Sequence, residues 1–233
     1  MGFVLLEGGS EFTAGMAAAD ERAMAAGGGR AAPIRIIPAA AAPDDNHVRA
    51  GANGVGWFQS LGAADVRSIP IIDRASADKP ELATELEAAR IVFMLGGFTR
   101  YLAETLAGSR AWQAMAAAHR AGAVIAGSSA GAMVLCEHYF DQASGQVLPG
   151  LNLVPGSCVL PHHNSFGHRW QRKLSATLPD AVLIGIDEET GMLNDAPGGR
   201  WTVYGKGTVT LYFGSTKTVL HHGHFFDLPG ARA

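Results

Sequence analysis

Ser129 is the residue whose surroundings most favour nucleophilic chemistry. It lies in Gly127-Ser-Ser-Ala-Gly131, where the two glycines give the G-x-S-x-G spacing. This spacing predicts a tight turn between a buried strand and a helix, because small neighbours let a strained backbone hold one hydroxyl above a sheet edge. The amides of Ala130 and Gly131 then open the helix and suit an anionic tetrahedral intermediate. The same turn also occurs in phosphate sites and in plain α/β packing, so the rest of the chain must decide.

A serine nucleophile needs a general base, and the base needs an acceptor that orients its other ring nitrogen. Among nine histidines, His162 is best placed, because it directly follows a predicted strand and so lies, like Ser129, at a strand end. His163 is expected to point to the opposite side. Asp141, in the polar segment between the serine and the histidine, is the predicted orienting acid, with Glu137 as the alternative.

Two groups of histidines suggest metal binding as a competing interpretation. They are His162, His163 and His168, and His221, His222 and His224. Neither group has a second set of cysteine or carboxylate ligands at a fixed spacing, so we expect no metal and no cofactor. We interpret Glu188 and Glu189, which follow a predicted strand, as turn charges rather than acid catalysts.

The order of elements predicts an α/β fold. Apolar runs predict strands at 3–6, 34–37, 65–72, 90–95, 123–127, 156–160 and 181–187. Helical patterns occupy 13–26, 46–61, 81–89, 99–107, 110–121, the segment after Ser129, and 169–178. Strands that are apolar on both faces and alternate with helices indicate a mostly parallel sheet sandwiched by helices.

The chain after the serine turn has a different pattern. Residues 137–151 are polar and punctuated by glycine, and they are predicted to form a loop. Residues 200–204, 208–213 and 218–221 alternate in period two, which predicts antiparallel strands that close the sheet edge. Gly96 and Gly97 end the strand at 90–95. Since ligands gather at the carboxyl ends of parallel strands, this glycine pair is placed to supply a second backbone donor beside Ser129.

Composition excludes several classes of protein. The 233 residues are 48% apolar and 17% charged, with a net charge of −3, which suits one soluble domain spanning 1–233. No basic stripe favours nucleic acid, and no apolar run is long enough for a membrane span. Cys136 and Cys158 lie in apolar surroundings and are predicted to be buried thiols. With no signal segment apparent, we expect a cytoplasmic monomer or homodimer.

Four segments together resemble the serine peptidases of the cyanophycinase and aspartyl dipeptidase (peptidase E) family. They are Gly127-Ser-Ser-Ala-Gly-Ala132, Gly96-Gly97, Leu160-Pro-His-His163 and Ile184-Gly-Ile-Asp-Glu-Glu-Thr190. The resemblance covers about residues 90–195 and implies a fold similar to class I glutamine amidotransferases, which belongs among flavodoxin-like sheets. It also implies Ser129 as nucleophile, His162 as base, and the amides of Gly97 and Ala130 as the oxyanion hole.

The sequence departs from that family at its substrate-binding arginine. In the dipeptidase branch an arginine after the histidine pairs with the aspartate side chain of the substrate. That position falls near Gly167, and only Arg169 or Arg172 lies close to it. Cyanophycinases usually have glutamine before the histidine and a longer chain, whereas Pro161 stands there in this sequence.

We therefore predict a serine peptidase that forms an acyl-enzyme on small or terminally anchored acidic peptides. One alternative is an esterase of the α/β-hydrolase type, in which a late histidine (His221, His222 or His224) acts as the base. Another is a non-catalytic protein that binds a small ligand on the same fold.

Overall fold

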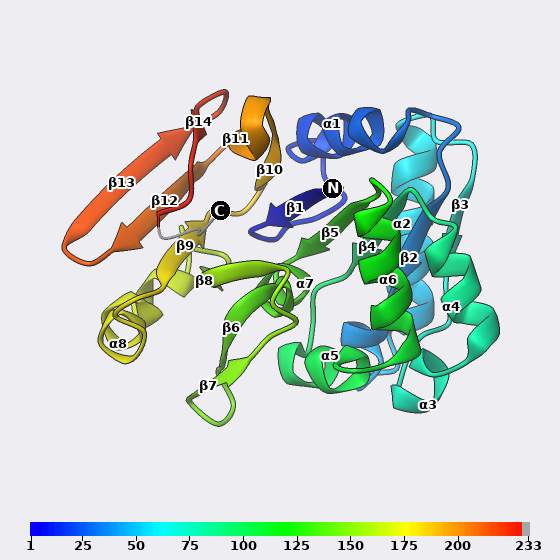
Figure 1. The fold of residues 1–233 in the computed structure, drawn as a ribbon, viewed down its shortest axis with the longest axis horizontal. Coiled ribbons are helices and arrows are strands. Elements are labelled where there is room, and N and C mark those ends of the chain that lie inside the picture. The colour runs from blue at the N-terminus through cyan, green and yellow to red at the C-terminus, as the bar shows by residue number, and fades with distance from the viewer. Residues whose placement is uncertain (230–233) are drawn as a thin grey trace.

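The parallel part of the predicted sheet forms as expected in the computed structural model, which describes residues 1–229. Eight strands make the first sheet (Figure 1), in the spatial order β14 (Phe225–Phe226), β11 (Arg200–Gly205), β10 (Thr190–Ala196), β1 (Phe3–Glu7), β5 (Val124–Ser128), β4 (Ile91–Met94), β2 (Ile34–Ile37) and β3 (Val66–Ser68). Strands β1, β5, β4, β2 and β3 pair in parallel, and β10, β11 and β14 add antiparallel strands beside β1. The carboxyl ends of β1, β4 and β5 therefore meet at one edge.

Helices cover both faces of this sheet because its central strands are buried on both sides. The helices are α1 (Ala17–Gly27), α2 (His47–Ser60), α3 (Arg74–Ala77), α4 (Pro80–Glu87), α5 (Thr99–Leu106), α6 (Arg110–Arg120), α7 (Ala130–Leu135) and α8 (Gln171–Thr177). Leu5, Ile36 and Phe93 face α1 and α2, whereas Leu6 and Met94 face the core shared by α4 to α7. The predicted sandwich of helices around a mostly parallel sheet is confirmed.

A second sheet lies beside the first and completes the core (Figure 1). Its strands are, in spatial order, β13 (Thr216–His221), β12 (Thr208–Phe213), β9 (Val182–Ile186), β8 (Val154–Leu160), β6 (Cys136–Asp141) and β7 (Gln146–Pro149). Strands β6, β8 and β9 are parallel, and the outer strands are antiparallel. The carboxyl ends of β8 and β9 thus become neighbours.

The loop predicted at 137–151 is wrong, because most of it forms the β6–β7 hairpin. Tyr139 and Phe140 are buried in the shared core, and Asp141 stabilises the hairpin turn by accepting hydrogen bonds from the amide and hydroxyl of Ser144. Polar residues around these two aromatic residues masked the strand. The antiparallel strands near the C-terminus are confirmed, but they are divided between the two sheets.

Element boundaries differ where local chemistry intervenes. The strand predicted at 65–72 is limited to Val66–Ser68, because Pro70 has no amide to continue the ladder. Helix α2 forms despite its glycines. Two of them are required by packing, because a Cβ at Gly51 would overlap Ser68 and one at Gly54 would crowd Ile36. Those glycines let the helix approach the sheet closely.

Both cysteines are buried free thiols, as predicted. Burial raises the pKa of Cys136 to about 11 and raises that of Cys158 further. Within residues 1–229, every helix is too short or too polar to cross a bilayer.

Candidate active site

Ser129 occupies a strained turn between β5 and α7. Its φ of 48° and ψ of −108° lie outside the ordinary regions for a residue with a side chain. The turn is held by the Ser129 amide, which donates to the carbonyl of Glu7 at 3.0 Å. A Cβ at Gly127 would overlap the backbone of Gly131, and one at Gly131 would overlap the carbonyl of Met94. The two glycines of the motif are therefore required by close packing of the strand against the helix.

His162 faces the Ser129 hydroxyl from the second sheet. It follows β8 with a φ of 47°, and its amide donates to the carbonyl of Gly8 at 2.8 Å. Its ring lies against Gly9, where any Cβ would overlap the imidazole, and it stacks on Phe166 with centroids 4.9 Å apart. Nε2 lies 3.0 Å from Ser129 Oγ, which is hydrogen-bond distance for proton transfer.

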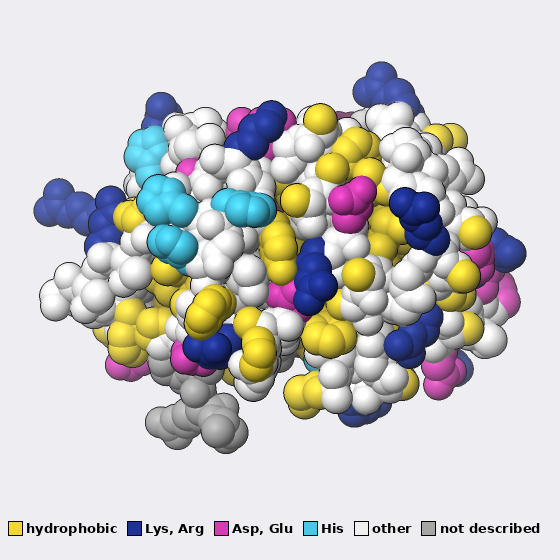
Figure 2. Space-filling view, turned by 90° about the horizontal axis from the view of Figure 1, so that it is seen from above, with side chains coloured by type: hydrophobic (Ala, Val, Ile, Leu, Met, Phe, Trp, Pro, Cys, Tyr) yellow, Lys and Arg dark blue, Asp and Glu magenta, His cyan; other side chains and the backbone are white. Residues whose placement is uncertain are grey.

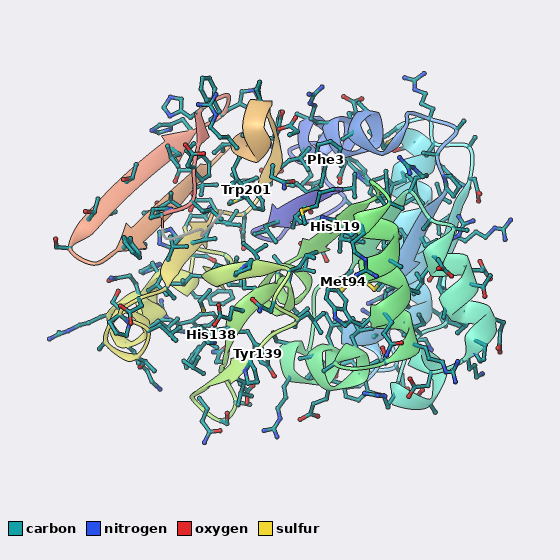
Figure 3. All side chains as sticks on the ribbon, in the orientation of Figure 1. Phe3, Met94, His119, His138, Tyr139 and Trp201 are labelled. Carbon is teal, nitrogen blue, oxygen red and sulfur yellow. The ribbon has the colours of Figure 1, made fainter. Side chains whose placement is uncertain are left out.

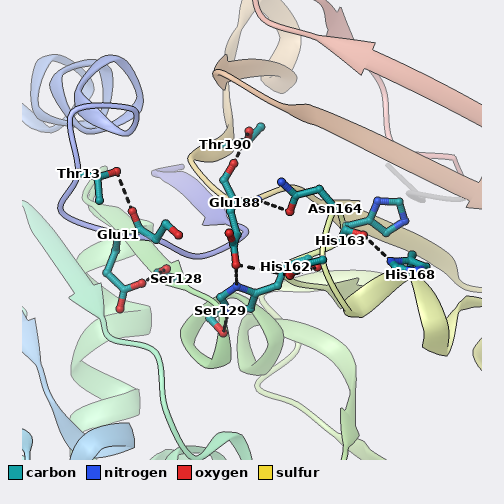
Figure 4. A network of polar contacts seen from close by, with 12 residues as sticks. Glu11, Thr13, Ser128, Ser129, His162, His163, Asn164, His168, Glu188 and Thr190 are labelled. Atoms are coloured by element: carbon teal, nitrogen blue, oxygen red, sulfur yellow. Dashed lines mark hydrogen bonds and ion pairs between the residues drawn. The ribbon is translucent and has the colours of Figure 1, made fainter.

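Glu188 orients the imidazole from its other side. Its Oε1 lies 2.8 Å from Nδ1 of His162 (Figure 4), and its amide donates to Asn164 Oδ1 at 3.1 Å. The carboxylate and Ser129 therefore bind opposite nitrogens of one imidazole ring, as in a catalytic triad. Glu188 directly follows Asp187 after β9, whereas His162 follows β8, and these strands are parallel neighbours.

The predictions for the orienting acid are therefore wrong. Asp141 lies in the hairpin turn, where Oδ2 accepts from the Ser144 hydroxyl at 2.6 Å. Glu137 accepts from the amide of Gly156 at 2.7 Å. Position between the serine and the histidine along the chain was a poor guide. The usable signal was that Glu188 follows a buried strand, as His162 does, so both lie at the carboxyl edge of one sheet.

Gly97 and Ser129 line one cleft of about 520 Å³. Gly97 has a φ of 137° and packs so tightly on the Ala40 carbonyl that a Cβ would overlap it. Ala130 is the first residue of α7, directly after the serine. Across residues 1–229, neither the Gly97 amide nor the Ala130 amide donates a hydrogen bond to another protein group.

The two candidate substrate-binding arginines do not line this cleft. Arg169 belongs to a short 3₁₀ turn (Gly167–Trp170) and Arg172 to α8, and both are exposed. The described residues that line the cleft are mostly apolar or aromatic, with Asp141 as the one charged side chain among them. An acidic substrate therefore has no arginine in this cleft.

A second cavity, with a volume of about 750 Å³, is lined by Gly96 and Glu11. A Cβ placed on Gly96 would lie 3.3 Å from both Glu11 Oε1 and Ser129 Cβ, so the Glu11 carboxylate lies close to the nucleophile. Glu11 Oε2 accepts from the Ser128 hydroxyl at 2.8 Å (Figure 4). Arg49 and Trp57 also line this cavity, which is more polar than the cleft on the Gly97 side.

Two carboxyl groups lie buried near Glu11. Glu7 and Asp20 are fully buried, and within the described chain neither Glu7 oxygen nor Asp20 Oδ1 has a hydrogen-bond partner. Burial and the neighbouring charge of Asp20 raise the pKa of Glu7 well above its usual value. Burial also raises the pKa of Asp20 to about 7, although Trp57 Nε1 donates to Oδ2 at 2.8 Å.

A second histidine–carboxylate pair follows the same two strands. His163 Nδ1 lies 3.5 Å from Asp187 Oδ1, and its Nε2 lies 3.0 Å from the Tyr212 hydroxyl. Burial raises the pKa of Asp187, but hydrogen bonds from His163 and from Thr208 outweigh it and lower the pKa below its usual value. His163 points away from Ser129, as its position beside His162 predicted.

His168 contacts the His163 carbonyl at 3.0 Å, and the histidines at 119, 221, 222 and 224 lie away from Ser129. His119 lies on α6 (Figure 3), and its carbonyl accepts a hydrogen bond from the Gly2 amide just before β1. The late histidines are exposed near β13, where His221 and His224 contact each other. Figure 2 shows histidine side chains grouped toward the end of the molecule that holds β13 and β14. In residues 1–229, no late histidine contacts Ser129, and no group of three or more His, Cys, Asp or Glu is arranged to hold a metal.

A strained serine with an imidazole at hydrogen-bond distance, on a mostly parallel α/β sheet, is the arrangement of a serine hydrolase. The profile of Peptidase family S51 matches residues 4–195. This chain belongs to Peptidase family S51, and it is a serine-type peptidase.

Relatives and solved structures agree with that membership. The chain is 31% identical to a cyanophycinase from Geminocystis herdmanii over 209 residues, which cover 84% of this chain and 75% of that protein. It is 31% identical to a cyanophycinase from Trichormus variabilis over 198 residues, covering 79% of this chain and 64% of that protein. A peptidase from an acI-B1 actinobacterium superposes with a TM-score of 0.87 and 29% identity, over 98% and 97% of the two chains.

A more distant structure shares the fold alone. A putative peptidase E from Listeria monocytogenes EGD-e superposes with a TM-score of 0.65 and 19% identity, over 89% of this chain and 100% of that one. These findings confirm the resemblance that the sequence motifs indicated.

Proposed function

We propose that this peptidase hydrolyses small peptides through an acyl-enzyme, with Ser129, His162 and Glu188 as its catalytic triad. The observation that carries the proposal is the line of contacts from Ser129 Oγ to His162 Nε2 at 3.0 Å and from His162 Nδ1 to Glu188 Oε1 at 2.8 Å. A carboxylate on Nδ1 keeps Nε2 free to accept the serine proton, and it stabilises the imidazolium that forms.

In the proposed reaction His162 removes the proton of Ser129 while Oγ attacks the peptide carbonyl. The amides of Gly97 and Ala130 hold the oxyanion of the tetrahedral intermediate, which then collapses as His162 protonates the leaving amine. Water, deprotonated by the same imidazole, attacks the acyl-enzyme, and the serine is released. The support for this oxyanion hole is that both amides lack an internal acceptor in the described chain and that Gly97 lines the Ser129 cleft.

The substrates that we propose range from dipeptides, which the sequence resemblance implied, to those of the relatives named cyanophycinase. The chain matches proteins named cyanophycinase over most of its own length. Acidic side chains were the first expectation, but Arg169 and Arg172 lie outside the cleft that holds Ser129. We therefore propose small peptides as substrates, and we propose that no arginine of this cleft binds an acidic side chain of the substrate.

Covalent labelling with a fluorophosphonate tests the triad directly. We expect the wild-type chain to be labelled on Ser129 and to release amino acids from a panel of dipeptides and isoaspartyl peptides. Ser129→Ala should abolish labelling and lower peptide turnover by several orders of magnitude. An unlabelled wild-type serine with no peptide turnover would indicate a ligand-binding protein on this fold, as the second alternative holds.

A further inference from the structure

We propose that the cleft beside Ser129 is a specificity subsite for a large, uncharged, apolar side chain of the substrate, aromatic side chains above all. This inference rests on the proposed peptidase function and names the side chain that its cleft selects. It departs from the expectation of acidic substrates.

One wall of the cleft is a continuous row of aromatic rings that begins at the base. Phe166 stacks on His162, its ring centroid lies 5.6 Å from that of Trp170, and Trp170 lies 5.1 Å from Phe140. All three aromatic side chains line the cleft with Ser129. A substrate side chain that passes the base therefore meets ring faces and edges, which favour apolar and aromatic groups.

Two apolar side chains of the cleft are open to solvent. Phe98, which precedes α5, is 46% exposed, and Phe166 is 36% exposed. Met133 lies in the cleft as well, and its Sδ accepts from the Thr99 hydroxyl at 3.7 Å. Exposed aromatic side chains that line a cleft with the nucleophile lose contact with water when a ligand enters, and this release favours binding of an apolar group.

The charge of the cleft disfavours an acidic side chain. Asp141 is the one charged residue that lines it among residues 1–229, and its Oδ2 accepts from the amide and hydroxyl of Ser144. Arg100 Nη1 lies 4.0 Å from Asp141, but Arg100 also pairs with Glu104 at 2.7 Å. These three side chains together leave one negative charge, so a substrate carboxylate would be repelled.

A cationic side chain gains less than an aromatic one in this cleft. A substrate ammonium or guanidinium would lose hydration on entering the cleft, and Asp141, whose Oδ2 already accepts from Ser144, offsets only part of that loss. An aromatic side chain loses no such hydration and contacts several rings at once.

A set of peptides that differ at one residue beside the scissile bond tests the preference. Phe, Leu, Ala, Lys and Asp are placed in turn on each side of the bond, and kcat/KM is measured with the full chain. We expect Phe and Leu to exceed Ala by about tenfold or more on one side, in line with the selectivity of hydrophobic pockets. Asp should fall below Ala. Equal values for all five residues, or a preference for Asp or Lys, would overturn the proposal.

Substitutions within the wall sharpen the test. Phe98→Ala and Trp170→Ala should each lower the ratio of kcat/KM for Phe over Ala peptides by about tenfold, whereas Asp141→Asn should raise kcat/KM for the Asp peptide. Phe225→Ala is the matched control, because Phe225 is 58% exposed but lies on β14, outside this cleft. An unchanged Phe/Ala ratio in both wall variants contradicts the subsite.

The outcome separates this inference from the proposed function. Fluorophosphonate labelling depends on Ser129 and His162 and does not need the aromatic wall. Normal labelling without a side-chain preference would contradict only the subsite, whereas absent labelling and absent turnover would contradict the triad itself.

Discussion

Two histidine–carboxylate pairs stand side by side in this molecule, and only one of them faces a nucleophile. His162 and His163 follow β8, and Glu188 and Asp187 follow β9. Each imidazole lies against a glycine, Gly9 for His162 and Gly185 for His163, where a Cβ would overlap the ring. The side chains of His163 and Asp187 are 11% and 12% exposed, whereas those of His162 and Glu188 are 21% and 37% exposed, so the pair that faces Ser129 is the more open to water.

The difference between the pairs lies in what faces Nε2. For His162 it is Ser129 Oγ on a strained turn, and for His163 it is the Tyr212 hydroxyl. Burial raises the pKa of Tyr212, so this phenol stays protonated and is a poor nucleophile. Residue type and local spacing are nearly the same in the two pairs. Function is therefore determined by the group across the ring, which belongs to a different sheet in the case of His162.

Removing the base should give the largest effect. His162→Gln keeps a polar side chain but removes the basic nitrogen, so turnover should fall by about 10⁶-fold, the scale seen when a triad base is lost. Peptide hydrolysis and the rate of fluorophosphonate labelling both measure it.

His163→Gln is the matched control for that change. Because His163 faces Tyr212 rather than Ser129, turnover should stay within a fewfold of wild type at temperatures where the variant is folded. A loss comparable to that of His162→Gln would show that the two pairs are not functionally distinct.

Removing the orienting acid should come next in size. Glu188→Gln keeps a side chain near Nδ1 but removes the negative charge that holds the imidazole tautomer and stabilises the imidazolium. Turnover should therefore fall by roughly 10³- to 10⁴-fold. Glu137→Gln is the control, because Glu137 binds the Gly156 amide and does not contact His162. Equal losses in the two variants would count against Glu188.

Much of this arrangement follows from the sequence, for reasons that particular residues make clear. Ser129 and His162 were predicted because glycine spacing and strand ends are local signals, and the structure brings the two together. The parallel order of strands was readable from apolar runs such as Ile91–Met94. Such patterns depend only on which residues of one segment are buried, so they can be recognised without knowing the tertiary structure.

The contact of Glu188 with His162 could not be predicted in that way. It depends on β8 and β9 being neighbours in a second sheet, and that pairing depends on contacts between distant segments. The β6–β7 hairpin was missed for a similar reason, because Tyr139 and Phe140 are buried only once the second sheet packs on α7. The polar composition of residues 137–151 therefore predicted a loop, whereas tertiary contacts stabilise two strands there.

The buried carboxyl groups of Glu7 and Asp20 should make the stability of the folded chain depend on pH. Burial raises the pKa of Asp20 to about 7, so the folded chain keeps a proton between about pH 4 and pH 7 that the unfolded chain releases. Its contribution to stability is complete below pH 4 and is lost as the pH rises through 7. Asp20→Asn should therefore reduce the fall in unfolding free energy between pH 4 and pH 8.

Denaturant unfolding at a series of pH values measures this effect. Asp44→Asn serves as the control, since Asp44 is exposed. An unchanged pH profile for Asp20→Asn would show that the buried carboxyl does not hold its proton in the folded state.

The contribution of Asp187 to stability should depend on pH in the opposite direction from that of Asp20, and the dependence should be smaller. Hydrogen bonds from His163 and Thr208 lower its pKa despite burial, so its stabilisation is present above about pH 4 and is lost as the pH falls through the folded pKa. Asp187→Asn should cost about 1–3 kcal/mol at pH 7 and much less below pH 3. Thermal unfolding at the two pH values checks the prediction, and a larger cost in acid than at neutral pH would contradict it.

The turn after β1 has a consequence for how this enzyme can be altered. Carbonyl groups of Glu7, Gly8 and Gly9 accept hydrogen bonds from the amides of Ser129, His162 and Glu189, so this stretch anchors the three loops that carry the proposed triad. A mutant library randomised at positions 8 and 9 should consequently return far fewer active clones than one randomised at positions 98 and 170. Directed evolution of new specificity belongs on the cleft wall, with this anchor left untouched.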